Sequence, residues 1–577
     1  MIEINKKVED LKKEIDITLN KTKIDLLIKN VKLINTFSGD IYKTDIAVHN
    51  GKIAGFGEYR AKNVIDARGM FASPGFIDGH VHIESSMVKI PEFAKVVLPC
   101  GTTSVVIDPH EIANVLGMEG IKYMLSSSVD AMLGVYVMLP SCVPSTNLET
   151  SGAMLSSHDL SLLLNDERIL GIAEIMNYPG VINKDEELLK KIAIANNKII
   201  DGHAPFLSGK NLYAYISAGI RSDHESSDIQ EAREKLRAGM FVMIREGTAA
   251  KNLKSLICLV NNSNSRKFLF VTDDRHLDDI EVEGHINYLV KKAIEYGVEP
   301  LKAVQMATIN AAEYFGLKNL GAILPGYLAD IIIFDDLKKM NIKMVFKNGV
   351  LVSKEGQIID GIIKEYKEKL RGTINVRWIE HDDFALKAET KKARVINVIP
   401  NEIITKMSIE NVKGDGGYVS SDTERDILKI AVIERHMASG RIAKGLVRGF
   451  KLKKGAIASS ISHDSHNIVV IGTHDGDMYE AAVGVVKMQG GITAALNGQI
   501  LESLPLPVAG LMSDRSADFV KTKIKRLKEV ARYLGSDLPD PFMAMSFLTL
   551  PPIPEIKITD RGIIDANKFK VVDLFVR

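Results

Sequence analysis

Eight short apolar segments, separated by helical patterns, occupy the sequence between residues 75 and 272. They fall at Gly75–Gly79, Thr103–Asp108, Gly134–Leu139, Ile169–Ile175, Lys198–Asp201, Gly219–Ser222, Phe241–Arg245 and Phe268–Thr272. The helical patterns include Lys184–Ala195, Lys210–Ser217, Asp228–Arg237, Ala249–Val260, His276–Tyr296 and Pro300–Phe315. Because each parallel strand needs a crossover, this α/β alternation predicts a (β/α)8, TIM-like barrel. An open, doubly wound sheet is the alternative, but no G-x-G-x-x-G motif after an early strand favours it.

Short β patterns lie on both sides of the predicted barrel. Upstream, a charged helical pattern at Val8–Ile17 precedes β patterns at Ile24–Ile28, Lys32–Asn35, Asp45–His49, Lys52–Gly57 and Asn63–Asp66. Downstream, β patterns return at Gly321–Leu324, Ala329–Phe334, Lys343–Lys347 and Leu351–Ser353. Turn residues separate the segments within each set. The two sets predict one small β domain built from both flanks of the barrel.

A chain of 577 residues is too long for a single core, and the part after residue 370 predicts a further α/β domain. That part contains a helical pattern at Ile427–Met437 and a glycine-rich strand region at Ile468–Gly490. We therefore expect four parts. Residues 1–72 form the N-terminal helix and first part of the small β domain, 73–318 the (β/α)8 barrel, 319–370 the second part of the β domain, and 371–577 a C-terminal α/β domain.

Charge and cysteine content narrow the class of protein. Lysine and arginine number 74 against 73 for aspartate and glutamate, a net charge of +1 that supports neither nucleic-acid nor membrane binding. The three cysteines, Cys100, Cys142 and Cys258, are too far apart for a zinc motif or a disulfide framework, which favours a reducing compartment. Residues 1–30 lack a signal-peptide core, and no apolar run reaches the length of a membrane span. These features predict a cytoplasmic protein.

Two histidines end the first predicted strand, in the sequence Gly79-His80-Val81-His82. Side chains alternate along a strand, so His80 and His82 point the same way and could bind one metal ion through imidazole nitrogens. Taken alone, such a pair is more often an ordinary pair of histidines at a turn. Other predicted strands carry ionisable residues as well: Glu174 within the fourth, and His203, His224 and Asp273-Asp274 after later ones.

The carboxyl ends of barrel strands meet on one face, which is where active sites of such barrels lie. The residues expected to converge there are His80, His82, Glu174, His203, His224 and Asp273. Chance rarely produces such a set, so a metal site is predicted. A carboxylate such as Glu174 can bridge two cations that share a hydroxide, because bound metals lower the pKa of water toward neutrality. Asp273 would take the proton of that hydroxide and pass it to the leaving group.

These motifs resemble the amidohydrolase superfamily and, more narrowly, the adenine deaminase family of bacteria and archaea. The matching strings are Gly79-His80-Val81-His82-Ile83-Glu84-Ser85-Ser86, Asp108-Pro109-His110-Glu111-Ile112-Ala113-Asn114, Ala173-Glu174-Ile175-Met176-Asn177-Tyr178-Pro179-Gly180 and Thr272-Asp273-Asp274-Arg275-His276. The resemblance covers nearly the whole chain. It includes the C-terminal string Ser462-His463-Asp464-Ser465-His466-Asn467, which most amidohydrolases lack.

The resemblance implies hydrolysis of adenine to hypoxanthine and ammonia in purine salvage, by a homodimer or larger homo-oligomer with two Mn(II) or Fe(II) ions. It implies that His80, His82 and Asp273 hold one metal and that His203 and His224 hold the other. Many amidohydrolases bridge their metals with a carboxylated lysine, and Glu174 would replace it here. The expected nucleophile is the metal-bridging hydroxide, which attacks the ring carbon that bears the amino group.

Further residues are expected near the substrate. His110 is a candidate catalytic residue, able to hydrogen-bond the purine or assist proton transfer. Glu111 could face the same cavity, or it could simply begin a helix, where an acid is favourable. Candidate substrate-binding residues are Glu84, Ser85, Ser86, Glu111 and Asp274.

The C-terminal cluster, His463-Asp464-Ser465-His466 together with His474-Asp475, permits a cation site, a lid over the barrel mouth or a polar turn. We favour a lid or interface role. His82-Ile83-Glu84 also matches the H-x-E half of the zinc cytidine-deaminase signature, but the P-C-x-x-C half is absent and that fold is rejected. Two alternative functions stay open: another cyclic amidohydrolase, opening a lactam or imide ring, and an inactive amidohydrolase-like scaffold.

Overall fold

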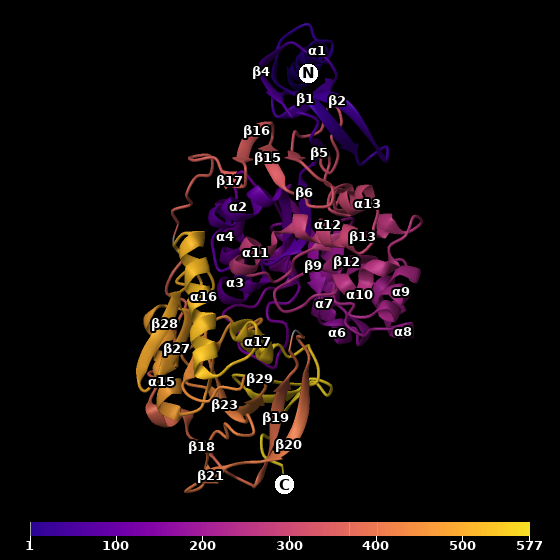
Figure 1. Ribbon diagram of the computed structural model, residues 1–577. Helices are drawn as coiled ribbons and strands as arrows, with labels where there is room; N and C mark the ends of the chain where they lie inside the picture. Colours follow the sequence, from indigo (N-terminus) through magenta and orange to yellow (C-terminus); the bar gives the residue numbers. More distant parts are fainter. Residues whose placement is uncertain (1, 369, 401, 577) are drawn as a thin grey trace.

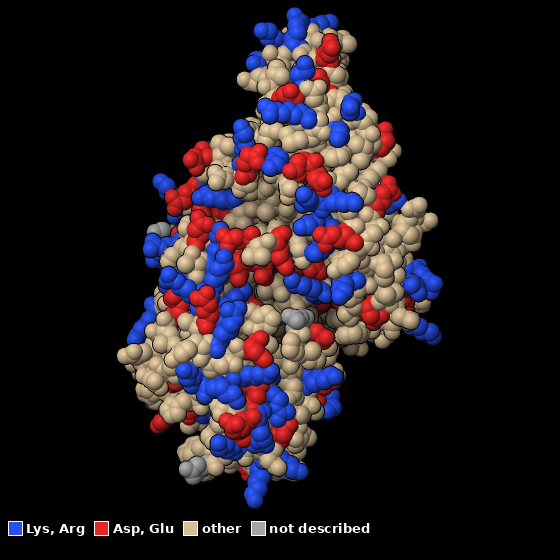
Figure 2. Space-filling model, in the orientation of Figure 1, with Lys and Arg blue, Asp and Glu red and all other residues tan. Residues whose placement is uncertain are grey.

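The computed structural model describes residues 2–368, 370–400 and 402–576. The molecule is elongated: an N-terminal β region lies at one end, the helix-rich parallel strands in the middle, and the C-terminal region at the other end (Figure 1). Lys, Arg, Asp and Glu are interspersed over the face shown in Figure 2, in keeping with the near-zero net charge. Within the described residues, no helix is both long enough and apolar enough to span a bilayer.

The central region contains eight parallel strands, and the predicted α/β class is confirmed. They are β6 (Phe76–Val81), β7 (Thr102–Ile107), β8 (Gly134–Leu139), β9 (Ile169–Ile175), β10 (Ile199–Gly202), β11 (Ser222–Asp223), β12 (Phe241–Arg245) and β13 (Phe268–Val271). Strands β6 to β10 form one sheet in sequence order, and β11 to β13 form another. The two sheets adjoin at both edges. Between β10 and β11, Arg221 N donates to Ile200 O at 3.1 Å, and between β6 and β13, Val81 pairs in parallel with Asp273. The strands therefore follow one another around a ring.

Alternate residues of these strands form two separate cores, as expected where both faces of a parallel sheet are covered. The inner core includes Ile77, Val106, Met138, Ala173, Met243 and Leu269, one side chain from each of six strands. Tyr314 and Phe315, from the end of α14 (Ile309–Tyr314) and the next residue, join that inner core. The other strand face belongs to a larger core shared with the surrounding helices, which include α2 (Ile90–Val97), α3 (His110–Leu116), α4 (Met118–Ser127), α7 (Glu186–Ile194), α8 (Gly209–Ser217) and α9 (Ile229–Arg237).

Three long helices expected from the sequence are shorter or divided. The pattern at 276–296 forms α11 (Leu277–Glu283) and α12 (Ile286–Glu295), because Gly284 leaves the helical conformation at φ 103°. The pattern at 300–315 forms α13 (Pro300–Met306) and α14, separated where Thr308 adopts φ −139° and ψ −93°. The pattern at 249–260 gives only α10 (Leu253–Leu256) and a following 3-10 turn.

One nine-stranded sheet combines strands from both flanks of the barrel. Its members are β1 (Ile24–Asn35), β2 (Asp40–His49), β3 (Lys52–Phe56), β4 (Ala61–Asp66), β5 (Phe71–Pro74), β14 (Ile331–Phe334), β15 (Ile342–Lys347), β16 (Val350–Lys354) and β17 (Gln357–Ile358). The antiparallel pair β5–β14 joins the two sets, and α1 (Ile2–Thr18) precedes them. Two expectations are wrong: residues 24–35 form one strand rather than two, and Gly321–Leu324 is not a strand, because Gly321 turns the chain at φ 79°.

The C-terminal region contains an eight-stranded sheet. Its strands, in spatial order, are β20 (Thr405–Asn411), β19 (Lys392–Val398), β24 (Ile442–Arg448), β23 (Leu428–Ile433), β26 (Ile468–Gly472), β25 (Ala456–Ser459), β27 (Gly491–Leu496) and β28 (Gln499–Pro505). The helix expected at 427–437 is wrong. That run supplies central strand β23, where β-branched residues pack well between two neighbouring strands. The glycine-rich region at 468–490 is only partly strand, since α15 (Asp475–Lys487) follows β26 and begins at a cap made by His474.

Two further helices connect this region with the barrel. α16 (Ala517–Leu534) lies against α11, and its Lys528 Nζ donates to Asp278 Oδ2 at 2.7 Å. α17 (Pro541–Ser546) begins at Asp540, which also pairs with Lys528 and with His276 of the barrel. A 3-10 turn, Phe547–Thr549, and three final strands follow: β29 (Ile556–Thr559), β30 (Gly562–Asp565) and β31 (Lys570–Val572). The C-terminal region is thereby held over the barrel.

Candidate metal centre and active site

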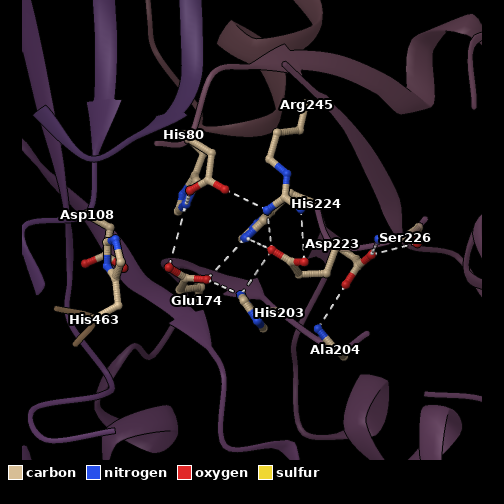
Figure 3. A network of polar contacts seen from close by, with 12 residues as sticks. His80, Asp108, Glu174, His203, Ala204, Asp223, His224, Ser226, Arg245 and His463 are labelled. Atoms are coloured by element: carbon tan, nitrogen blue, oxygen red, sulfur yellow. Dashed lines mark hydrogen bonds and ion pairs between the residues drawn. The ribbon is translucent and has the colours of Figure 1, made fainter. Parts of the chain in front are cut away.

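The carboxyl ends of the barrel strands bring six predicted ligands into one buried cluster. They are His80 and His82 at the end of β6, Glu174 in β9, His203 after β10, His224 after β11, and Asp273 after β13. Glu174 lies between His80 and the pair His203 and His224 (Figure 3). Its Oε2 is 2.6 Å from His203 Nδ1 and 3.2 Å from His224 Nε2, while its Oε1 is 3.7 Å from His80 Nε2.

Asp273 closes the cluster from the last strand. Its Oδ1 lies 3.1 Å from His82 Nε2 and 3.5 Å from His80 Nε2. Its Oδ2 accepts a hydrogen bond from Arg245 Nη1 at 2.6 Å. Asp273 N donates to His80 O at 2.9 Å, and Asp273 has a φ of 58°, a conformation uncommon for a residue other than glycine. The first and last strands of the barrel are thus joined at the site itself.

The donor atoms of this cluster fit divalent cations. Three overlapping groups each have ligand atoms within 4.8 Å of one another: His80, His82 and Asp273; His80, Glu174 and His224; and His203, His224 and Glu225. His80 Nε2 and His203 Nε2 are buried without a hydrogen-bond partner, which is costly for imidazole nitrogens unless a metal ion binds them. Imidazole and carboxylate donors together suit ions such as Mn²⁺, Fe²⁺ or Zn²⁺.

The electrostatics of the cavity also favour cations. Its walls carry six carboxylates and one arginine; the carboxylates belong to Glu111, Glu174, Glu225, Asp273, Asp274 and Asp464. Burial alone would raise the pKa of Glu174, but the His203 and His224 rings hold it well below its usual value. Burial would also raise the pKa of Asp273, but the Arg245 guanidinium keeps that pKa well below its usual range. Both carboxylates are therefore ionised and available as ligands.

Backbone and side-chain contacts fix the loops that carry the histidines. Asp223 accepts from Ala204 N at 3.0 Å and from Ser226 (Figure 3). It also pairs with buried Lys235 at 2.9 Å. These bonds join the loop after β10 to the loop after β11. On the other side, His82 Nδ1 lies 2.9 Å from Asp108 O, which orients the ring so that Nε2 faces Asp273.

His110 and Glu111 both line the cavity at the start of α3. His110 Nδ1 pairs with Asp108 Oδ2 at 2.9 Å, and its Nε2 lies 3.3 Å from Glu111 Oε1 and 3.7 Å from Asp464. Cys142 lies close enough for His110, Cys142 and Asp464 to offer three donor atoms within 4.8 Å of one another. Glu111 therefore faces the cavity as well as beginning a helix.

Of the remaining candidate substrate-binding residues, the structure places only Asp274 on the cavity wall. Asp274 lines the cavity and accepts a hydrogen bond from Ser85. Glu84, Ser85 and Ser86 are buried but are not among the side chains that line it. Glu84 accepts from Ile112 N at 3.2 Å, and Ser86 donates to Ile83 O. These contacts hold the first strand end against α3, and a substrate-binding role for the three residues stays a prediction.

Comparison with known proteins gives two family matches within the chain. Residues 71–352 match the amidohydrolase family, and residues 402–570 match the adenine deaminase C-terminal domain. Adenine deaminase 2 of Carboxydothermus hydrogenoformans is 48% identical over 568 residues, which cover 98% of this chain and 99% of that protein. The chain belongs to the adenine deaminase family.

Adenine deaminase of Thermosipho africanus is also 48% identical, over 571 residues that cover 97% of this chain and 99% of that protein. Among solved structures, the beta-aspartyl dipeptidase of Fervidobacterium islandicum matches with a TM-score of 0.45 at 18% identity, over 58% of this chain and 98% of that one. The two adenine deaminases, each 48% identical to this chain, confirm the family resemblance seen in the sequence motifs over nearly the full length of the chain.

Several cavity residues of this adenine deaminase family member were missed from the sequence. Glu225 and Arg245 form a buried ion pair, and Arg245 also contacts Asp273. The sequence contained a local signal for both, because Glu225 follows the predicted ligand His224 and Arg245 is the last residue of a barrel strand. The apolar residues Ile403, Phe547 and Leu550 also line the cavity, and nothing in their local sequence marks them as site residues.

Proposed function

We propose that this chain hydrolyses adenine to hypoxanthine and ammonia at a centre of two divalent metal ions, Mn(II) or Fe(II). The observation that carries the proposal is the buried cluster around Glu174, four imidazoles and two carboxylates at strand ends, in a chain related along its length to proteins named adenine deaminase. The reaction breaks the exocyclic C–N bond of a cyclic amidine, in keeping with the hydrolase family to which the chain belongs.

In this proposal His80, His82 and Asp273 would hold one ion, His203 and His224 the other, and Glu174 would contact both. The unpartnered nitrogens of His80 and His203 and the surplus of buried carboxylates support these assignments. Bound divalent ions supply a water that is deprotonated near neutral pH and positive charge opposite the developing negative charge.

Three side chains of the protein itself would take part in proton transfer or position the group that does. Asp273 would accept the proton of the attacking water and deliver it to the amino group, so that ammonia leaves rather than an amide anion. Arg245 would hold the second oxygen of Asp273 in place during both transfers. His110, oriented by Asp108, would offer Nε2 to the substrate side of the cavity.

The same proposal covers the pathway, the cellular compartment and the oligomeric state of the enzyme. We expect the enzyme to act in purine salvage in the cytoplasm, as a homodimer or larger homo-oligomer, and to use the four parts set out from the sequence, divided at residues 72, 318 and 370. Three free cysteines fit a reducing compartment. Acidic and basic side chains are mixed on the face shown in Figure 2, which fits a small neutral substrate.

The test is adenine turnover by the full chain loaded anaerobically with Mn(II) or Fe(II). Loss of adenine absorbance and release of ammonia should agree in amount, with hypoxanthine as the product. His80→Ala and Glu174→Ala should abolish turnover, whereas His158→Ala, at an exposed histidine, should leave it unchanged. Two metals bound without adenine turnover would redirect the search to cyclic amides, and no bound metal in the wild type would overturn the proposed centre.

A further inference from the structure

One imidazole in the catalytic cavity comes from the C-terminal region. His463 lies between β25 and β26, and its ring lines the cavity with Glu111, Asp274 and Asp464. Its Nδ1 is 2.7 Å from Glu111 Oε1, a residue of the barrel. Its Nε2 is buried and has no partner. A carboxylate at one ring nitrogen fixes the tautomer and leaves the other nitrogen for chemistry.

The position of this imidazole is fixed from several sides. The ring stacks on Phe547 with centroids 4.7 Å apart and planes at 12°. His463 N donates to Ser546 O at 3.0 Å, and His463 O accepts from Thr549 Oγ1 at 2.9 Å. His466 contacts the other oxygen of Glu111. A side chain restrained in this way is pre-organised, which is what a group acting on substrate requires.

The surroundings of His463 suit a flat, uncharged ring. Ile403, Phe547 and Leu550 give the cavity an apolar wall on the C-terminal side. Buried Lys557 holds two parts of this wall together, because its Nζ donates to Ile403 O at 2.7 Å and to Phe547 O at 2.9 Å. Ligand sites of this kind combine an apolar surface with a few placed polar groups.

We propose that His463, held by Glu111, contacts the heterocyclic substrate and is a second acid–base residue of the reaction, donating a proton from Nε2 to the ring nitrogen next to the reacting carbon. This rests on the proposed adenine hydrolysis and adds a substrate contact made by the C-terminal region. The substrate class is an aromatic ring in which the carbon bearing the amino group is doubly bonded to a neighbouring nitrogen.

The proton balance of this step is complete. When the water oxygen adds to the carbon, the π pair of the C=N bond moves to the ring nitrogen, which takes the Nε2 proton. The first water proton passes through Asp273 to the amino group, the C–N bond breaks, and ammonia leaves with the bonding pair. The hydroxyl on the same carbon then loses the second water proton, which returns to Nε2 as the carbonyl forms. Both protons of one water are thereby accounted for.

The charges around the ring favour its protonated form. Burial would lower the pKa of His463, but the negative charges of Glu111, Asp274 and Asp464 outweigh it and raise the pKa to about 9. His466 faces the same carboxylate from the C-terminal side, where burial, together with the neighbouring His463, keeps its own pKa below the usual value. Near neutral pH the imidazole therefore carries a proton to donate.

The experiment uses the full chain loaded with Mn(II), comparing His463→Gln with His381→Gln, an exposed histidine of the same region. His463→Gln should lower kcat/KM for adenine by about 10²-fold or more, the usual contribution of one acid–base group. The manganese bound per chain should stay the same, because His463 is no ligand. His381→Gln should behave as the wild type.

Glu111→Gln gives a second, independent readout. It leaves the imidazole in place but removes its anionic partner, so the pKa of His463 should fall. The alkaline limb of the kcat/KM profile, where protonated His463 is lost, should then move to lower pH. This readout also decides the matter if His463→Gln does not fold.

Three results would overturn the assignment. They are wild-type kcat/KM in His463→Gln, loss of manganese in parallel with activity in that variant, and an unchanged alkaline limb in Glu111→Gln. A wild-type chain that binds manganese but never converts adenine would instead overturn the proposed reaction, and the role of His463 with it. The two failures are therefore distinguishable by the wild-type assay alone.

Discussion

The barrel strand ends and the C-terminal region face each other across one cavity, yet they contribute different kinds of side chain. The barrel supplies buried charge: four of the histidines, Asp273, Glu174 and the Glu225–Arg245 pair all lie at or near the carboxyl ends of strands. The C-terminal region supplies an apolar wall from Ile403, Phe547 and Leu550, with His463 beside it.

The difference follows from what each kind of group needs. Ligands for cations must be held to a fraction of an ångström, and strands of a closed ring, bonded on both sides, provide that rigidity. An apolar wall needs only to exclude water and match the shape of a ring, which a docked second region can do. The comparison predicts that barrel variants lose metal or turnover, whereas variants of the C-terminal wall lose substrate affinity.

Glu174→Gln should have the largest effect. Glu174 lies between the two halves of the histidine cluster, and an amide replaces one of its two charged oxygens with a donor that repels a cation. We expect metal content to fall below two per chain and adenine turnover to fall to background. Metal analysis and ammonia release on the same sample test this.

A matched control is Glu187→Gln, on α7 outside the cavity, which should retain both metals. Full metal content together with full turnover in Glu174→Gln would show that the charged cluster of the barrel is not the metal-binding site.

Arg245→Gln comes next. Arg245 keeps the pKa of Asp273 well below its usual value, so Asp273 is ionised throughout the neutral range. Without the guanidinium that pKa rises, and the ionised form that accepts a proton is lost as pH falls through the higher value. The acidic limb of kcat should move to higher pH, and kcat at pH 7 should fall by roughly 10²-fold.

The pH profile of kcat, recorded with saturating metal, checks the Arg245 prediction. Arg221→Gln, at an exposed arginine on the opposite end of a neighbouring strand, serves as the control. An acidic limb that stays in place, with only KM raised, would assign Arg245 to substrate binding instead.

Much of the barrel could be predicted from the sequence. The bounds of β8, β9 and β12 agree with the expected ranges to the residue, because apolar runs of five to seven residues ended by turns leave little choice. The six expected ligands meet because strand ends of one barrel share a face, so their convergence needed no knowledge of distant contacts.

The errors lie where local pattern and tertiary context disagree. The run 427–437 fits either a buried strand or a helix by its apolar content, and pairing with β24 and β26 decides for the strand. His463 and Glu111 come from opposite halves of the chain, so their contact has no sequence signature. The favoured interface role for the 462–467 string agrees with where His463 lies, but its approach to the barrel carboxylate was not predicted.

Lys528→Met probes how the wall is held over the barrel. Lys528 is buried and pairs with Asp278 of the barrel and with Asp540, each at 2.7 Å. Removing the ammonium leaves two buried carboxylates without their cationic partner. Breaking a buried pair in this way lowers the free energy of unfolding by about 3–5 kcal/mol. Thermal unfolding should begin at a lower temperature, and KM for adenine should rise more than kcat falls.

The ion pair between Lys528 and Asp540 also makes the stability of the protein depend on pH. Lys528 and His276 outweigh burial and hold the pKa of Asp540 far below its unfolded value. Asp540 therefore contributes stability above a pH of about 4, its unfolded pKa, and that contribution is lost as pH falls further. In Lys528→Met the folded-state pKa of Asp540 rises, so its stabilising contribution should be smaller and its loss on acidification should be complete at a higher pH. Lys525→Met, at an exposed lysine of the same helix, is the control.

Phe547→Leu should have the smallest effect and the most selective one. The substitution keeps the wall apolar but removes the ring that stacks on His463. The Phe547 ring also lines the cavity, and loss of one aromatic contact with the bound purine would amount to about 0.5–1.5 kcal/mol, a rise in KM of roughly two- to tenfold. Metal content should not change, because Phe547 belongs to the C-terminal wall, and kcat should stay within about twofold, because Glu111 and the backbone bonds of His463 still hold the imidazole. Tyr533→Leu, at an exposed aromatic residue of α16, controls for general effects of losing a ring. If Phe547→Leu instead reduced kcat as strongly as Arg245→Gln, the wall would act on the reaction through His463 as well as on binding, and the division between a catalytic barrel and a binding wall would no longer hold.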